Sequence, residues 1–426
     1  MMISKQELIQ LNKTHKKLIM KSNKMTYIIA LLGFFLSLTF NSCSSNDDQV
    51  FDPPTAEEPD ENLETVEFYL TTPDQSNLVR LQESGFGTLT DNDGFTISVD
   101  EDETYQSMDG FGFTLTGGSA LHINNMSASA KNALLNDLFG PSAVHSSYVR
   151  VSIGASDLDE APFSYNDLPA GQTDVNLDNF SIDPDRTNLI PVLQEIIAIN
   201  PEIKIMGSPW SAPVWMKDNG NTVGGELLPQ YYGVYADYFV KYIQAMASEG
   251  IPIDAITIQN EPENPFNNPS MFMTAEQQAD FIANHLGPAF AAASITTKII
   301  IFDHNPDNIG YPISILNNAN ANPYIDGSAF HLYAGQISSL SAVHNAHPDK
   351  NIYFSEQWIE APGDFPSDLR WHMRELIIGA TRNWSKTVLE WNLAADPNNR
   401  HLPKFHTSEN QFPMHISWLL HLQKLH

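Results

Sequence analysis

Cysteine is almost absent from this sequence, and the usual signatures of metal and cofactor sites are absent with it. The only cysteine is Cys43, and no group of cysteines and histidines has the spacing of a zinc site. The sequence also contains neither a P-loop nor the glycine-rich fingerprint of dinucleotide-binding folds. We therefore expect a protein that needs no metal and no organic cofactor.

Positive charge is also scarce. The chain has 22 lysines and arginines against 51 aspartates and glutamates, which gives a formal net charge of −29. Such a surface repels the phosphate backbone of nucleic acids, so nucleic acid is a poor candidate partner. A neutral carbohydrate substrate is compatible with this charge.

Apolar residues, by contrast, are plentiful enough for a large core. Hydrophobic residues make up 42% of the chain and aromatic residues 10%. This composition argues against global disorder. A length of 426 residues leaves room for a domain of TIM-barrel size and something smaller beside it.

The N-terminal region has the features of an export leader. Several lysines precede the 14-residue apolar stretch "YIIALLGFFLSLTF" (27–40), which is short for a membrane span and well sized for a signal-peptide core. Cys43 follows in "NSCSSNDD", an arrangement that resembles a bacterial lipoprotein site. We expect a leader over residues 1–43, an acidic proline-rich tether over 44–62, and an exported cell-envelope or outer-membrane lipoprotein whose only membrane contact is the lipid. Cleavage nearby without lipid is the alternative.

After the tether, strand patterns come first and alternating strand and helix patterns follow. Residues 63–105 contain three alternating segments that predict β-strands of a side domain. From residue 106 to 398, eight apolar strand candidates are each followed by a helical or loop segment: "FGFTL", "SYVRVSIG", "IKIMGSPW", "DAITIQNEP", "KIIIFDHN", "GSAFHLYA", "NIYFSEQW" and "KTVLEWNLA". This pattern favours a (β/α)8 TIM barrel. A doubly wound open sheet is the alternative, but no glycine-rich phosphate loop follows the first strand.

Among the helical segments, the one from Thr274 has the clearest start signal. It begins with the capping-box pattern Thr274–Gln277, and its periodicity predicts a helix over "TAEQQADFIANHLGPAF".

Two of the strand candidates end in carboxylates. The fourth ends in Asn260 and Glu261, and the seventh ends in Glu356, 95 residues later. This separation corresponds to three βα units, so the two glutamates face each other across the catalytic mouth of a barrel. Two opposed carboxyl groups in a sugar-sized pocket are the apparatus of glycosidic bond cleavage. The alternative for either glutamate alone is a solvated or ion-paired surface carboxylate.

Five motifs carry a specific resemblance. They are "TIQNEP", "SPWSAPVWMK", "GFGFTLTGGSA", "FHLYAG" and "YFSEQW", and the stretch from about residue 66 to 398 resembles glycoside hydrolase family 30, the glucosylceramidase-like retaining β-glycosidases. The resemblance implies that Glu261 is the general acid/base, that Glu356 is the nucleophile, and that Asn260 binds the sugar 2-hydroxyl. For these roles Glu261 is expected to be protonated near neutral pH and Glu356 ionised.

The resemblance also implies supporting roles. Arg150 matches an arginine near the nucleophile, where its charge keeps Glu356 ionised. The positions that match sugar-contacting residues are Asp157, Trp210, His331, Tyr333 and Trp391. The alternatives are that the tryptophans are core aromatics, that the histidine is a satisfied buried side chain, and that Arg150 is a structural ion-pair partner.

The C-terminal residues depart from the family pattern. Residues 399–426 match nothing in the family and are rich in histidine and lysine. The family continues there with strands that complete a β-sandwich, so we expect the N-terminal strands to form an incomplete sandwich with exposed edges. The segment "MHISWLLHLQKL" is expected to form a short helix.

The leading functional hypothesis is a retaining β-glycosidase of the glucosylceramidase or β-glucosidase type that hydrolyses β-glucosidic bonds by double displacement. A related barrel hydrolase acting on β-1,6-glucan, β-xylan or β-fucosides is the enzymatic alternative. An inactive, truncated glycan-binding remnant is the alternative without catalysis. The oligomeric state is left open.

Overall fold

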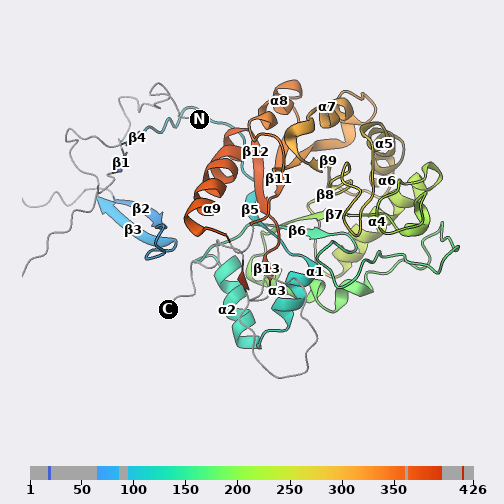
Figure 1. Cartoon of the computed structure of the whole chain (residues 1–426), viewed down its shortest axis with the longest axis horizontal. Helices are drawn as coiled ribbons and strands as arrows, with labels where there is room; N and C mark the ends of the chain where they lie inside the picture. The colour runs from blue at the N-terminus through green and yellow to red at the C-terminus, as the bar shows by residue number, and fades with distance from the viewer. Residues whose placement is uncertain (1–17, 21–64, 86–94, 360–362, 396–414, 417–426) are drawn as a thin grey trace, which may run out of the picture. The chain divides into compact units, whose positions relative to one another are not determined.

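The computed structural model describes residues 18–20, 65–85, 95–359, 363–395 and 415–416. The chain forms two compact units, residues 1–104 and residues 105–426. The second unit contains a closed barrel of eight parallel strands, in the order β10-β11-β12-β5-β6-β7-β8-β9. The prediction of a (β/α)8 barrel is therefore confirmed (Figure 1).

Each barrel strand lies within or overlaps one of the eight predicted segments. The strands are β5 Gly110–Thr114, β6 Tyr148–Ser152, β7 Lys204–Ser208, β8 Ala255–Thr257, β9 Lys298–His304, β10 Ile325–His331, β11 Asn351–Glu356 and β12 Ser385–Glu390. Strands buried on both faces read as continuous apolar runs, which is why these segments stand out in the sequence.

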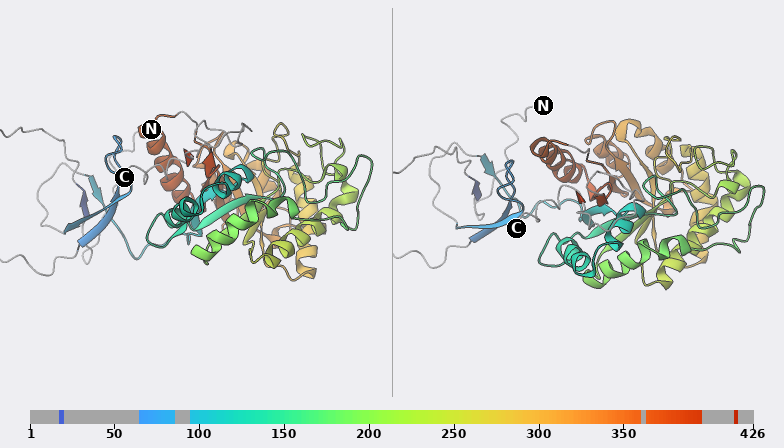
Figure 2. Two further views of the ribbon diagram at one scale, coloured as in Figure 1. Left: turned by 90° about the horizontal axis from the view of Figure 1, so that it is seen from below. Right: turned by 60° about the horizontal axis from the view of Figure 1, so that its bottom comes forward.

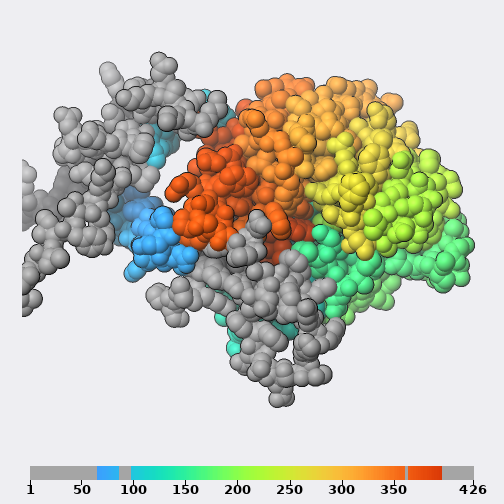
Figure 3. Space-filling model, in the orientation of Figure 1, coloured from blue at the N-terminus to red at the C-terminus, as the bar shows by residue number. Residues whose placement is uncertain are grey.

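The connections between the strands carry the outer helices. They are α1 Gly117–Asn124, α2 Ala128–Phe139, α3 Leu189–Ile199, α4 Tyr232–Ser248, α5 Ala275–Phe281, α6 Gly287–Ala292, α7 Gly310–Leu316, α8 Ser339–Ala346 and α9 Phe365–His372. Short 3-10 turns lie at Asp183–Arg186, Val214–Met216, Pro229–Tyr231, Pro306–Asn308 and Asn322–Tyr324. The helices surround the sheet (Figure 2). Successive segments of the barrel follow one another in chain order around the visible face (Figure 3).

Two layers of apolar side chains hold the barrel together. One cluster takes a single residue from each of seven successive strands and fills the interior: Tyr148, Met206, Ala255, Ile300, Ala329, Tyr353 and Leu389. A much larger cluster packs the outer strand faces against the helices. The interior is thus a packed core, as in other barrels of this kind, and chemistry is confined to the strand ends.

A close backbone approach explains one glycine of the "GFGFT" motif. A Cβ atom on Gly112 would lie 1.7 Å from the carbonyl oxygen of Tyr148. Gly112 and Tyr148 are paired in the register of β5 and β6. Only glycine therefore allows the two strands to pair at this point.

The strand ends that point to the mouth are irregular. The register of β9 against β10 shifts at Asp303. Phe302 pairs with Ala329 and His304 pairs with Phe330, so Asp303 has no partner in β10. Such an extra residue in one strand is a β-bulge. Phe302 and Asp303 have φ values of 73° and 61°, and Glu261 has a φ of 47°. Such backbone conformations are strained for residues with side chains. They re-aim the polar side chains that end these strands.

The helix predicted from Thr274 begins as expected but is not one regular helix. Thr274 and Gln277 form the reciprocal hydrogen bonds of a capping box, which confirms the start. The segment then passes from α5 through a π-helical turn, Ile282–Leu286, into α6. Pro288 stands in the first turn of α6, and because proline has no backbone N–H, the regular hydrogen-bond pattern is interrupted there. A second π-helical segment, Met373–Ala380, follows α9.

The described residues of the first unit form two small antiparallel sheets. β1 Leu18–Met20 pairs with β4 Phe95–Ile97, and β2 Thr65–Leu70 pairs with β3 Arg80–Gly85. The three segments predicted as strands are therefore strands. Tyr69 is 69% exposed and Leu81 45% exposed, and the expectation that these strands belong to an incomplete sandwich with exposed edges stays a prediction.

Several expectations about the chain ends fall outside the described residues. These include the apolar stretch 27–40, Cys43 and the tether 44–62. Within the described residues, no helix has the length and apolarity to cross a membrane. At the other end, His415–Ile416 forms β14, which pairs antiparallel with β13 Ala394–Ala395. The prediction of a helix is wrong for His415 and Ile416, because their backbone is extended and paired with β13. The remainder of 399–426 is not described.

Candidate active site

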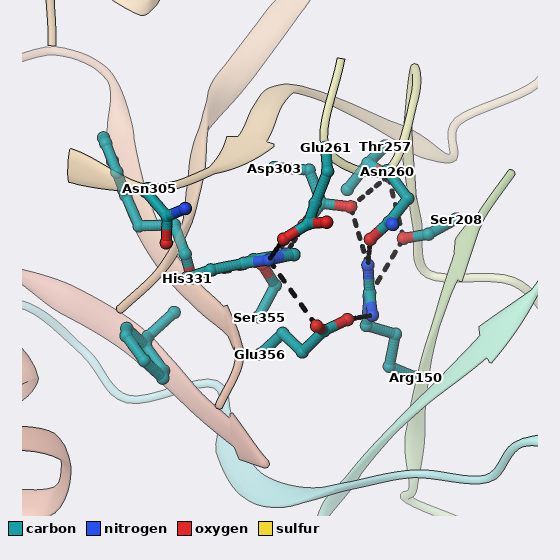
Figure 4. Close-up of polar contacts among 12 residues, drawn as sticks. Arg150, Ser208, Thr257, Asn260, Glu261, Asp303, Asn305, His331, Ser355 and Glu356 are labelled. Atoms are coloured by element: carbon teal, nitrogen blue, oxygen red, sulfur yellow. Dashed lines mark hydrogen bonds and ion pairs between the residues drawn. The ribbon is translucent and has the colours of Figure 1, made fainter. Parts of the chain in front are cut away.

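The predicted site residues come together where strands leave the barrel core. Asn260 and Glu261 follow β8, His331 ends β10, and Glu356 ends β11. Arg150 lies in β6, whose five residues are all buried. These side chains converge in one cluster (Figure 4), as the shared carboxyl edge of parallel strands requires.

Arg150 is the cation at the base of this cluster. Its guanidinium donates to Glu356 Oε2 at 2.6 Å, to Asn260 Oδ1 at 2.6 Å and to Asp303 Oδ2 at 2.8 Å. Its Nε donates to Ser208 Oγ at 3.1 Å. Burial would lower the pKa of Arg150, but the two carboxylates raise it. Arg150 thus lies beside Glu356 as expected, and the role of Glu356 as nucleophile stays a prediction.

Asp303 is a carboxylate of the site that was not predicted from the sequence. It is fully buried, and both of its oxygens accept two hydrogen bonds. The four donors are His331, Ser355, Arg150 and Thr257. Burial raises the pKa of Asp303, but the charges of Arg150 and His331 outweigh burial and hold that pKa far below its usual range.

His331 stands between three carboxylates. Its Nδ1 lies 3.1 Å from Glu261 Oε1 and 3.6 Å from Glu356 Oε1, and its Nε2 lies 3.1 Å from Asp303 Oδ1. Burial lowers the pKa of His331, but the charge of Glu356 and the hydrogen bonds to Asp303 and Glu261 outweigh burial and raise it to about 10. The imidazole is therefore a protonated bridge at neutral pH.

The pKa values of the two glutamates are separated in the sense opposite to expectation. Burial raises the pKa of Glu261, but His331 and Asn264 outweigh burial and bring it to about 2. Burial, together with the charges of Glu261 and Asp303, outweighs the effect of His331 and Arg150 and raises the pKa of Glu356. The expectation that Glu261 holds the proton at rest is therefore wrong. The sequence position of Glu261 gave no indication that a protonated histidine lies against it.

The proton nevertheless lies beside Glu261. Nδ1 of His331 and Oε1 of Glu261 are 3.1 Å apart, so one proton in this hydrogen bond can sit on either atom. A neutral glutamic acid beside a neutral imidazole has the same number of protons as a carboxylate beside an imidazolium. The pair Glu261–His331, rather than Glu261 alone, holds the proton that an acid catalyst needs.

The predicted sugar-contacting aromatics line one side of the cluster. Trp210 and Trp391 stack with ring centroids 5.4 Å apart, and the guanidinium of Arg150 lies 5.0 Å from the centroid of Trp210. Trp210 is almost fully buried, whereas Trp391 keeps partial access to solvent. The Tyr333 hydroxyl donates to Glu356 Oε1 at 3.0 Å.

Asp157 lies apart from this hydrogen-bonded cluster, as a residue exposed to solvent. Its partly desolvated surroundings, together with the charges of Glu356 and Glu261, raise the pKa of Asp157 to about 6. The carboxyl group of Asp157 is thus close enough to both glutamates for their charges to raise its pKa, and it remains accessible to a ligand.

Further polar residues of the site were not found from the sequence. They are Ser208, Thr257, Asn264, Asn267, Asp303 and Ser355. A signal existed for Asp303, because a carboxylate inside the apolar run "KIIIFDH" demands buried partners. The other five are short polar residues whose role depends on which strand or loop lies beside them.

Glu261, His331 and Glu356 also form the one group in the described chain with the arrangement of a possible metal site. One ligand atom from each lies within 4.8 Å of the others. The positive charges of Arg150 and His331 already face these carboxylates, so a metal ion would compete with them. The absence of a cofactor stays a prediction.

The distance between the carboxylate oxygens of Glu261 and Glu356 bears on the type of reaction that this site can catalyse. An oxygen of Glu261 lies within 4.8 Å of an oxygen of Glu356. Carboxyl groups about 5–5.5 Å apart are typical of glycosidases that retain configuration, and inverting enzymes need roughly 6.5–9.5 Å to admit a water. The spacing fits direct attack by one carboxylate.

Comparison with known proteins agrees with this geometry. Residues 108–401 match the glycosyl hydrolase family 30 TIM-barrel domain. The chain belongs to family 30. The resemblance noted from the sequence motifs is thereby confirmed.

Curated proteins similar to this chain include glucanases and glucosylceramidases. The chain is 36% identical to an endo-1,6-beta-D-glucanase of Neurospora crassa over 74% of its own length. It is 29% identical to the lysosomal acid glucosylceramidase of Mus musculus over 71% of its length. The solved structure of an endo-beta1,6-glucanase matches with a TM-score of 0.70 and 36% identity, covering 77% of this chain and 73% of that one. The chain spans 66% and 63% of the two curated relatives.

A pH titration of stability tests the state of His331. The raised pKa means that His331 contributes stability in full below pH 6.5, its ordinary pKa, and that this contribution is lost as pH rises toward about 10. Thermal unfolding followed from pH 6 to 10 is expected to show this decline. In His331→Gln the buried carboxylates lose their charged partner, so its melting temperature should be lower at pH 6. The gap to the unsubstituted protein should narrow toward pH 10, and a gap that is constant with pH would contradict the protonated bridge.

Proposed function

We propose that this protein is a retaining β-glycosidase that hydrolyses β-1,6-linked glucan. The observation that carries the reaction type is the pair of glutamate oxygens within 4.8 Å of each other, beside a buried arginine and a protonated histidine. The β-1,6-glucan preference is supported by the higher identity to the Neurospora crassa glucanase than to the mouse glucosylceramidase, 36% against 29%. The hypothesis that the protein hydrolyses glucosylceramide has correspondingly less support.

In the first step Glu356 attacks the anomeric carbon. Arg150 holds its Oε2 and Tyr333 holds its Oε1, so the carboxylate is fixed on both sides and cannot rotate away. Arg150 also donates a hydrogen bond to the side-chain amide oxygen of Asn260, Oδ1. That contact turns the NH2 end of the Asn260 side chain outward, where it can donate to the sugar 2-hydroxyl.

The leaving oxygen receives its proton from the Glu261–His331 pair. As the glycosidic bond breaks, the proton of the Nδ1···Oε1 hydrogen bond settles on Glu261 and passes to the departing oxygen. Attack by Glu356 removes a negative charge near His331 at the same time. In the second step Glu261 takes a proton from water, which then displaces the sugar from Glu356 with its β configuration retained.

The sugar ring in this proposal lies against the partly exposed face of Trp391, which Trp210 supports from behind. The indole N–H of Trp210 is buried and has no hydrogen-bond partner among the described residues, so the role of Trp210 in this proposal is to support Trp391. Asp157 is suited to grip hydroxyl groups farther from the reacting carbon. Xylan or fucoside substrates would use the same carboxylates, and a glycan-binding remnant would use the same aromatics.

A substrate panel separates these functions. Purified protein is expected to release oligosaccharides from β-1,6-glucan and to act weakly on β-xylan, β-fucosides and glucosylceramide in detergent. Chromatographic product profiles give the measurement, with Glu356→Gln as the inactive control. Faster release from glucosylceramide than from β-1,6-glucan would refute the linkage preference, and binding of glucan without any hydrolysis would favour the remnant.

Azide rescue tests the division of labour between the two glutamates. Glu261→Ala removes the proton donor, so turnover of an unactivated β-glucoside should fall about 10²–10⁴-fold, whereas the first step with an activated aryl glucoside is spared. Azide then fills the space of the lost carboxylate, attacks the glycosyl-enzyme and gives a β-glycosyl azide, which nuclear magnetic resonance identifies. Rescue of Glu356→Ala to a β-azide, with no effect on Glu261→Ala, would mean that the roles are reversed.

We also propose that the protein is exported and held at the cell envelope by a lipid on Cys43. The support is the order of lysines, short apolar stretch and cysteine in the N-terminal sequence. Cys43→Ala is expected to move the protein from the membrane fraction to the soluble exported fraction, as followed by immunoblotting. Ser45→Ala serves as the control that leaves the cysteine in place. Membrane association that survives Cys43→Ala would rule out the anchor.

A further inference from the structure

Phe266 is the most exposed large apolar side chain among the described residues. It is 84% exposed and lies in the loop between β8 and α5, five residues after Glu261. A phenylalanine held almost entirely in water gains nothing from the fold. Single exposed apolar side chains are common on protein surfaces, so what distinguishes Phe266 is its place in a loop that contacts Glu261.

The loop places Phe266 on one particular side of Glu261. Asn264 Nδ2 donates to Glu261 Oε2 at 2.7 Å, and Asn267 Nδ2 lies 3.5 Å from the same oxygen. Phe266 stands between these two asparagines in the chain, and its N–H donates to Asn264 Oδ1 at 3.3 Å. The loop therefore folds over Oε2, while Oε1 faces His331 and, beyond it, Glu356.

This orientation identifies the part of the substrate that meets the loop. The sugar that is attacked lies toward Glu356, and the group that receives the proton lies beside Glu261. Residues that cover the outer oxygen of Glu261 therefore line the path of the leaving group.

The loop is firmly anchored, so the exposure of Phe266 is not a sign of looseness. The buried Lys217 donates to the carbonyl oxygens of Ser270 and Thr222, at 2.8 and 3.3 Å. The backbone N–H of Gly224 donates to Ser270 Oγ at 2.9 Å. These contacts fix the far end of the loop against the segment that follows β7.

We propose that Phe266 is the platform on which the leaving-group glucosyl unit stacks. This inference rests on the proposed function and specifies the site that binds the leaving side of the glucan. The C–H face of a pyranose covers an aromatic ring, and its hydroxyl groups point outward to polar neighbours. Glu263 supplies such a neighbour, because its carboxylate is exposed to solvent and accepts a hydrogen bond from Asn308 Nδ2 at 2.8 Å.

A sugar fits this place better than a lipid chain. The neighbouring loop residues Asn264, Asn267 and Glu263 are polar, and a hydrocarbon chain would strip such groups of water without replacing their hydrogen bonds. A glucosyl unit both covers the ring and supplies hydroxyl partners.

The test compares substrates that differ only on the leaving side. For Phe266→Ala, kcat/KM on a linear β-1,6-gluco-oligosaccharide should fall about 10- to 100-fold, mainly through a higher KM. Its kcat/KM on an activated aryl β-glucoside should change less than about threefold. Phe266→Trp should retain oligosaccharide hydrolysis, and Ile378→Ala, which removes another exposed apolar side chain, should change neither substrate.

Two results would overturn the platform. One is equal loss on both substrates, which would mean that Phe266 acts only through the position of Glu261. The other is unchanged oligosaccharide hydrolysis in Phe266→Ala. Calorimetric binding of the oligosaccharide to Glu356→Gln, with and without Phe266→Ala, measures the same contact without turnover, and about tenfold weaker binding is expected. If the unsubstituted protein hydrolyses no β-glucoside, the proposed function fails, whereas unchanged binding would refute the platform alone.

Discussion

The arrangement of the site depends on one buried carboxylate, Asp303. Its two oxygens accept hydrogen bonds from side chains on four neighbouring parts of the barrel. One of these donors is Arg150, which in turn orients Glu356, and another is His331, which contacts Glu261. Removing one partner from a buried charge network is strongly destabilising because the remaining charge has no compensation. The reacting groups are therefore fixed by a residue that takes no part in the chemistry.

Charge balance in this network explains how a glutamate with a low pKa can serve an acid catalyst. Two cations, Arg150 and His331, face three carboxylates, those of Glu261, Asp303 and Glu356. Enzymes commonly raise the pKa of the acid residue by burial alone. Here the histidine stabilises the charged form of Glu261 and keeps a proton within one hydrogen bond. In the proposed mechanism, loss of the Glu356 charge during attack weakens the interactions that hold the proton on the imidazole, and this favours transfer of the proton to Glu261.

Much of the fold was predictable from the sequence, because each strand is marked by the residues of its own segment. Eight buried parallel strands read as eight apolar runs, and glutamates at two of the strand ends stand out because polar groups there interrupt those runs. Asp303 was not found, since it lies inside such a run and is turned to the site only by a bulge that appears in the register with β10. The pKa order of the glutamates was predicted wrongly for a similar reason, because it depends on a histidine from a strand two positions away in the barrel. Motif spacing locates the reacting residues, but only the three-dimensional packing shows their protonation.

The complete occupation of Asp303 has a consequence for how such an enzyme can diverge. A substrate finds no remaining acceptor on this carboxylate, so the network beneath the sugar is insulated from whatever lies above it. The parts of the loops after β8 and β9 that do not contact Glu261 can then change in length and composition while the contacts of Asp303 are kept. A barrel built in this way can be redirected by exchanging its outer loop segments, without redesign of the buried network.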